Sequence, residues 1–134
     1  MSEKVEKLVD ELLDAEENVY GVAVIGKDGN LIMQTKNWDI SNDLDQINKL
    51  LETKLELGQK GMSSIRIQGI KYMIVENTEE RKIGTNIKGK GHLIICPVPV
   101  GGTGAVVCYI NPKIGPRDAL LEVQKHAQKF EGII

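Results

Sequence analysis

The sequence predicts a mixed α/β fold in which helices cover an antiparallel sheet. In residues 64–110, apolar side chains recur with a period of two, which is the pattern of β-strands. Short segments rich in glycine and asparagine separate these runs, and gaps of hairpin length join antiparallel rather than parallel neighbours. Three other segments have a helical period instead. We therefore expect a meander of about five strands, with the remaining elements covering one or both of its faces.

The first part of the chain predicts a helix followed by a hairpin. Residues 3–15 have a single apolar stripe at helical spacing. The stripe consists of Val5, Leu8, Val9, Leu12 and Leu13. Two strands are expected next, over residues 19–26 and 31–35. Asp28-Gly29 lies between them, and Asp-Gly between two apolar runs is a strong hairpin signal.

A second helix is expected over residues 42–57. Its apolar positions follow a helical rather than a strand period. They are Leu44, Ile47, Leu50, Leu51, Leu55 and Leu57. Gly58 is a natural stop for a helix, because glycine adopts the left-handed conformation that often follows the last turn. Residues 59–63 then predict a loop before the meander.

The later part of the meander is less regular. Residues 81–90 form a weak strand, whose two faces would carry different side chains: Lys82, Asn86, Lys88 and Lys90 on one, Ile83, Thr85 and Ile87 on the other. Residues 92–100 are clearly apolar, but Pro97 and Pro99 cannot donate ladder hydrogen bonds. That strand is therefore expected at an edge of the sheet or to end near Pro97. Residues 105–110 form the last strand.

The chain closes with a third helix, and Pro116 suits its first turn because the missing N–H costs nothing there. The expected buried stripe is Leu120, Val123, Ala127 and Phe130. The expected outward flank is Lys113, Arg117, Leu121 and Lys125.

Size and composition are those of one ordinary globular domain, residues 1–134. No apolar run approaches the roughly 20 residues needed to span a membrane, and the charged N-terminus is not a signal peptide, so a cytoplasmic location is expected. Cys96 and Cys108 lie in apolar runs and predict reduced core residues. The net charge of −2 is unevenly distributed. Residues 81–129 are predominantly basic, and such a surface attracts an acidic protein, a phospholipid headgroup or a nucleic acid.

No convincing active site can be assembled from the sequence. His92 and His126 lack metal-ligand spacing, and a dyad of His92 with Cys108 is disfavoured because Cys108 belongs to an apolar strand. The glycines of residues 101–104 lack the pattern of a phosphate-binding loop. Aromatic residues are only 4% of the chain, so a nucleic-acid-binding sheet is not supported. We expect a binding protein that needs no metal or other cofactor.

The order of elements and several segments resemble the profilin family across nearly the whole chain. The segments are GVAVIGKDGNLIMQT (21–35), IRIQGIKYMIV (65–75), NIKGKGHLII (86–95) and the strand and helix from Ala105 onward. The low aromatic content is more similar to the divergent archaeal profilins than to eukaryotic ones. The resemblance implies a central antiparallel sheet of about seven strands. The N- and C-terminal helices would cover one face and the middle helix the other.

The resemblance also implies a partner and a surface for it. Profilins bind monomeric actin, regulate its polymerisation and so associate with the cytoskeleton. The surface combines the strands after the middle helix with the start and exposed flank of the last helix. In this chain it corresponds to Lys71, Met73, Lys88, Lys90, Lys113, Ile114, Arg117, Leu121 and Lys125. The basic charge suits acidic actin, and a monomer with one interface of standard size is expected.

Two further ligands of the family lead to different expectations. Polyproline stacks on aromatic rings, but the matching positions here are Val5, Leu8, Ile32 and Phe130, of which only one is aromatic. Binding of plain polyproline is therefore expected to be weak or absent. The resemblance also implies a phosphoinositide site formed by Arg81, Lys82, Lys88 and Lys90.

Two other classes fit parts of the same pattern. A roadblock- or longin-like domain, which dimerises as a platform for small GTPases, has a similar order of helices and strands. The extra strand between Val75 and His92 argues against it. A PAS- or GAF-like sensor would hold a small ligand over the sheet, but no polar residues converge on an obvious interior site.

Overall fold

The computed structural model describes residues 2–52 and 64–134. It confirms the expected order of helix, two strands, helix, five strands and helix. The elements are α1 (Ser2–Ala15), β1 (Val19–Ile25), β2 (Leu31–Gln34), α2 (Leu44–Glu52), β3 (Ser64–Ile67), β4 (Ile70–Asn77), β5 (Lys82–Thr85), β6 (His92–Val98), β7 (Gly104–Ile110), α3 (Arg117–Ala127) and a final 3₁₀ turn (Gln128–Phe130).

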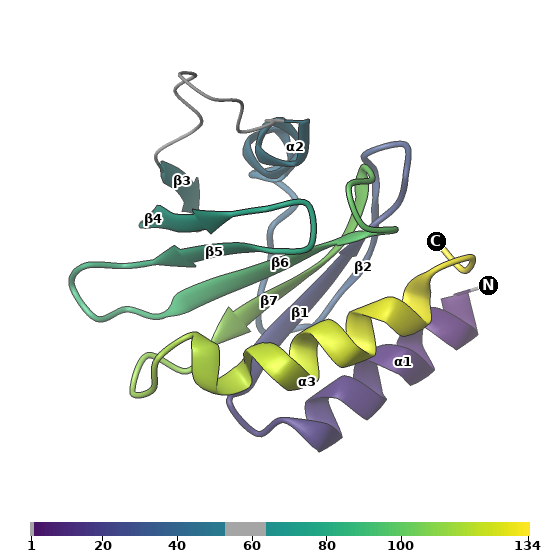
Figure 1. The fold of residues 1–134 in the computed structure, drawn as a ribbon, viewed down its shortest axis with the longest axis horizontal. Coiled ribbons are helices and arrows are strands. Elements are labelled where there is room, and N and C mark those ends of the chain that lie inside the picture. The colour runs from purple at the N-terminus through teal and green to yellow at the C-terminus, as the bar shows by residue number, and fades with distance from the viewer. Residues whose placement is uncertain (1, 53–63) are drawn as a thin grey trace.

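All seven strands belong to one sheet in the order β2-β1-β7-β6-β5-β4-β3, and every pair is antiparallel. Strand β1 pairs with β7, which brings the beginning and end of the chain together at the middle of the sheet. Strands β2 and β3 are the two edges. Figure 1 shows α1 and α3 lying side by side on one side of this sheet, with α2 near β3 at its far end.

Strands β1, β6 and β7 are buried on both faces of the sheet, as the expected arrangement of helices requires. On one face, here called the α1–α3 face, residues of α1 and α3 pack on alternate residues of β1, β6 and β7. On the other, the α2 face, Trp38, Ile40 and residues of α2 pack on the intervening residues and on β3 and β4. Successive strand residues point to opposite faces, so each strand contributes to both cores.

The predicted hairpin at Asp28-Gly29 is confirmed. Gly29 has φ +85°, a left-handed conformation that glycine adopts without steric cost. The backbone N–H of Gly26 donates to the carbonyl of Asn30 (2.9 Å), and the Asp28 carboxylate accepts from the N–H of Asn30 (3.1 Å). The Asp side chain and the glycine conformation together close the turn between β1 and β2.

Two expectations differ in part from the structure, and a third lies outside its described residues. Helix α2 is described only to Glu52, so its expected continuation to residue 57, Gly58 and the loop to 63 lie outside the described residues. Strand β6 lies inside the sheet rather than at an edge, but it ends at Val98, in agreement with the expected end near Pro97. Its pairing with β5 stops where Lys82 lies opposite Ile95, so Pro97 is paired with β7 alone. In α3, Ala119 rather than Leu120 is fully buried, whereas Val123, Ala127 and Phe130 of the expected stripe are buried as predicted.

Candidate functional site

The sheet is left open on part of its α1–α3 face. The core under α1 and α3 takes residues from β1, β6 and β7 but none from β3, β4 or β5. Strands β3 and β4 are covered on the α2 face, by Ile65, Ile67 and Tyr72 among others. On the α1–α3 face Ile83 of β5 is buried opposite Ile94, but Arg66 and Lys71 of β3 and β4 are exposed and available to a partner, next to the N-terminal end of α3.

A hollow of about 290 Å³ lies on this open part of the sheet. It is called the basic hollow here, and its lining is Arg66, Gly69, Ile70, Lys71, Met73, Asn86, Ile87, Lys88 and Lys90. Four of these, Lys71, Met73, Lys88 and Lys90, were predicted as partner-binding residues, and the fold brings them together from β4 and the β5–β6 turn. Among the residues that the structure describes, no acidic side chain lines the basic hollow, so four cations converge there without a described carboxylate to neutralise them.

Asn86 holds the two sides of the basic hollow together. Its side-chain amide donates to the backbone carbonyl of Lys71 on β4 (2.8 Å). Its side-chain oxygen accepts from the backbone N–H groups of Lys88 (2.9 Å) and Lys90 (3.1 Å). A single side chain thus fixes the backbone of the turn relative to the strand. The lysine backbones are held in place, which reduces the entropy lost when their side chains bind.

Of the residues that line the basic hollow, Arg66 was not predicted from the sequence and Ile87 was predicted in a different position. Arg66 lies directly opposite Lys71 in the β3–β4 ladder, and the Gln68-Gly69 turn could have revealed this register. Ile87 was expected on the same face of an extended strand as Ile83 and Thr85. Because β5 already ends at Thr85, Ile87 lies in the turn instead and is 82% exposed.

His92 connects the sheet to the loop before α3. Its Nε2 lies 2.6 Å from the carbonyl oxygen of Ile114, and its Nδ1 lies 2.7 Å from the hydroxyl of Thr85. Since a carbonyl can only accept, Nε2 carries a proton, and in the neutral ring Nδ1 accepts from Thr85. These bonds fix Ile114 beside β5 and β6. Lys113, in the same loop, is exposed.

A β-bulge directs Glu76 toward α3. The register of β4 against β5 shifts between Ile74 and Glu76, which leaves Val75 as an extra residue. Glu76 therefore faces the same side as Met73, and its carboxylate accepts from Arg117 (2.9 Å) and Arg81 (2.5 Å). The hydrogen bonds from Arg117 and Arg81 hold the pKa of Glu76 below its ordinary value. Arg117 is thus anchored to the sheet.

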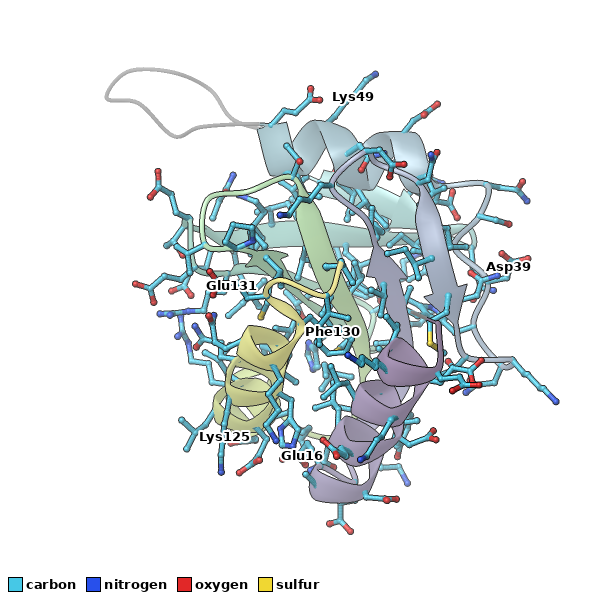
Figure 2. The ribbon with its side chains drawn as sticks, turned by 90° about the vertical axis from the view of Figure 1, so that its right-hand side faces the viewer. Glu16, Asp39, Lys49, Lys125, Phe130 and Glu131 are labelled. Carbon is cyan, nitrogen blue, oxygen red and sulfur yellow. The ribbon has the colours of Figure 1, made fainter. Side chains whose placement is uncertain are left out.

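The remaining predicted residues lie along the exposed flank of α3. Leu121 is 76% exposed although it is apolar, and Lys125 is also exposed. Figure 2 shows Lys125 pointing away from the body of the protein.

The residues expected to bind phosphoinositides do not form one surface. Lys82 is buried on the α2 face, where its ammonium donates to the side chain of Asn77 and its pKa is lowered by burial. Arg81 pairs with Glu76 and Glu80. Lys88 and Lys90 alone remain at an exposed site, where the basic hollow adds Arg66 and Lys71.

The residues that match a polyproline groove are mostly core residues. Val5 and Phe130 are fully buried between α1, α3 and the sheet, and Leu8 is half-buried against them. Figure 2 shows Phe130 pointing inward between the two helices. Ile32, on β2, is exposed. No aromatic ring of the described residues is available on this surface, so weak or absent polyproline binding stays a prediction with a physical reason.

The thiols do not form a nucleophilic site. Cys96 and Cys108 are free and buried, as expected. Burial raises the pKa of Cys96 to about 12 and that of Cys108 well above its ordinary value, which disfavours a reactive thiolate. Both ring nitrogens of His92 are already engaged. Within residues 2–52 and 64–134 there is no group of three or more metal-ligating side chains.

Comparison with known proteins agrees with this arrangement. The model of the family "Profilin" matches residues 3–132, so the chain belongs to the profilin family. It is 63% identical over 134 residues to Loki profilin-1 of Lokiarchaeum sp., covering 100% of each chain. Its structure superposes with a TM-score of 0.96 on the profilin in a "LokiProfilin2/Rabbit Actin Complex", at 61% identity and covering 100% of both chains.

A more distant comparison establishes how general the fold is. Profilin IB of Acanthamoeba castellanii superposes with a TM-score of 0.72, covering 92% of this chain and 94% of that one, at only 18% identity. The roadblock- or longin-like and PAS- or GAF-like alternatives are not supported. Among the described residues, no helix is long and apolar enough to cross a bilayer.

Proposed function

We propose that this chain binds monomeric actin and regulates its polymerisation. The main support for this proposal is that a relative with 61% identity and the same fold is solved in complex with rabbit actin. The open sheet face adds a physical reason, because it combines exposed apolar side chains with a basic hollow that no described acidic residue lines. The protein acts as one domain of residues 1–134, as a monomer, in the cytoplasm and in association with the cytoskeleton.

The proposed interface consists of the basic hollow, the loop at Lys113 and Ile114, and the α3 flank of Arg117, Leu121 and Lys125. The basic residues attract an acidic surface from a distance and set its orientation, which mainly raises the association rate. Met73, Ile87 and Leu121 provide apolar area, and a few such anchors supply most of the affinity. Occupying one end of an actin monomer interferes with spontaneous nucleation.

This activity is binding rather than catalysis. The two thiols are buried and protonated, and His92 serves to position Ile114. His126 is buried, with Nδ1 2.9 Å from the backbone carbonyl of Glu122. Binding of actin through this surface requires no metal and no cofactor.

The test is polymerisation of fluorescently labelled actin with increasing amounts of the protein, with its mass measured by light scattering. We expect a monomer that suppresses spontaneous nucleation in a dose-dependent manner. The double variant Lys88→Glu, Lys90→Glu is expected to bind actin at least about tenfold more weakly, since two attractive contacts become repulsive. Lys4→Glu, an exposed charge reversal on α1, is the matched control. Equal activity of both variants would place the interface elsewhere.

Anionic headgroups are a second candidate ligand of the basic hollow. Four cations with no acid among them attract a multiply charged phosphate. Vesicles containing a phosphoinositide should bind the wild-type protein and compete with actin. Arg66→Glu should reduce that binding, whereas Lys82→Met should not, because Lys82 is buried on the other face.

A further inference from the structure

Nearly all the aromatic residues of the chain gather around a second hollow. It has a volume of about 440 Å³ and is lined by Val19, Tyr20, Asn37, Trp38, Gln68, Ile70, Tyr72 and Tyr109. It is called the aromatic hollow here, and it lies on the α2 face, opposite the basic hollow. The chain has one tryptophan, three tyrosines and one phenylalanine, so only Phe130 lies elsewhere. A volume of this size, lined by aromatic rings and a few polar groups, is typical of small-ligand sites.

Two of the rings stack on each other, and a third lies tilted beside them. Trp38 and Tyr109 stack with centroids 5.9 Å apart and an interplanar angle of 27°. Tyr20 is tilted by 59° against Tyr109 at a centroid distance of 6.4 Å. Gly21 permits this placement of Trp38, because a Cβ there would lie 2.9 Å from the Cβ of Trp38. A flat ring can extend the stack, since offset stacking is the preferred contact of aromatic faces.

Two buried residues of the aromatic hollow, Trp38 and Tyr72, carry polar groups that lack a partner among the described residues. Trp38 is 4% exposed and Tyr72 is 1% exposed, yet neither side chain makes a hydrogen bond to the described part of the chain. In that part, the only fully enclosed side-chain polar atom without a partner is Nδ2 of Asn77. The indole N–H and the Tyr72 hydroxyl therefore remain accessible, and the aromatic hollow is the cavity that both residues line.

Two other polar groups of the lining are already engaged, whereas the Tyr20 hydroxyl and the Gln68 side-chain amide belong to exposed residues. The Tyr109 hydroxyl donates to the carbonyl of Lys90 (2.6 Å), and the Asn37 amide donates to the carbonyl of Tyr20 (2.8 Å). An indole N–H can only donate, so the edge of a ligand that faces it must accept. None of the described residues that line the aromatic hollow is charged, so none of them would compensate the desolvation of a charged ligand there.

We propose that the aromatic hollow binds a flat, uncharged heterocycle that carries carbonyl acceptors on its edge. The ring stacks beside Trp38 and Tyr109, Tyr20 closes one side, and the carbonyl groups accept from the Trp38 indole and the Tyr72 hydroxyl. The site lies on the other face of the sheet from the proposed actin surface, although Ile70 lines both hollows, and ligand binding there does not depend on actin binding.

The test uses 1,3-dimethyluracil, which is flat and uncharged and has acceptors but no N–H or O–H donors. Because the chain has a single tryptophan, its indole N–H gives one isolated cross-peak in a ¹H–¹⁵N spectrum. We expect that cross-peak to move downfield on titration, with a dissociation constant on the order of millimolar for so small a ligand. Toluene, a flat ring without acceptors, should leave the indole proton without this downfield shift.

Two matched variants locate the hydrogen bonds. Tyr72→Phe removes an unpaired hydroxyl and should weaken 1,3-dimethyluracil about fivefold, the effect of one hydrogen bond, with no effect on toluene. Tyr109→Phe removes a hydroxyl that is bonded to Lys90 and should leave both affinities unchanged. An indole cross-peak that does not move, or equal losses in the two variants, would overturn the proposal. So would much tighter binding of uridine 5′-monophosphate, because it would require a charged site.

Discussion

Ile87 provides the sharpest test of the proposed actin surface, because the free protein gains almost nothing from this side chain. It is 82% exposed at the tip of the β5–β6 turn. Replacing it by alanine removes three carbon atoms, each worth about 0.8 kcal/mol when buried. An interface would cover the exposed fraction of this side chain, so the loss is multiplied by that fraction. Ile87→Ala should therefore cost about 2 kcal/mol of binding free energy, or about thirtyfold in Kd.

The assay is a fluorescence titration of labelled monomeric actin, with thermal unfolding of each variant measured in parallel. Ile87→Ala should leave the free energy of unfolding within about 0.5 kcal/mol of the wild type, as surface substitutions usually do. Val100→Ala is the control, since Val100 is also apolar and 46% exposed but lies at the opposite end of β6. An unchanged Kd for Ile87→Ala, or an equal loss for Val100→Ala, would refute the assignment of this turn to the interface.

Three further predictions concern stability and can be measured by chemical unfolding. His92→Phe should cost about 2 kcal/mol, because two hydrogen bonds are lost while the ring volume is kept; a smaller loss would mean that His92 does not hold the loop. The lowered pKa of Glu76 predicts a stabilisation that is present above its ordinary value of 4.5 and lost as pH falls below it. Glu76→Gln should therefore remove about 1 kcal/mol near pH 7 and flatten the acid limb of the stability profile, which an unchanged limb would contradict. Phe130→Ala should cost about 3–5 kcal/mol, since Phe130 is fully buried; a cost under 1 kcal/mol would show that its site collapses.

The elements of the fold could be predicted because their signals are local. The Asp28-Gly29 turn and the apolar stripe of α1 depend on neighbours within a few residues, and both are confirmed. The convergence of Lys71 with Lys88 and Lys90 came from the family resemblance, not from any local pattern. It is produced by the pairing of β4 with β5 across the turn that Asn86 holds.

The face on which a side chain lies was predicted wrongly where a single residue shifts the alternation of a strand or ends the strand. Lys82 and Lys88 share a face only if the strand continues through both, but β5 ends at Thr85. Lys82 is therefore buried on one face and Lys88 lies in an exposed turn. The aromatic hollow could not be predicted from the sequence for another reason. Trp38 and Tyr109 are far apart in the chain, and no periodicity within one segment indicates that their rings stack.

The bulge leaves Val75 outside the regular pairing of β4 with β5. The Val75 side chain is itself largely exposed, so many residue types could stand there. Ile74 pairs with Gly84 and Glu76 pairs with Ile83, so deleting Val75 would give a regular ladder in which Glu76 keeps its face and its contact with Arg117. The chain should therefore tolerate both substitution and deletion at Val75, whereas losing any other single residue between Ile70 and Glu76 would reverse the faces of the side chains on one side of the deletion.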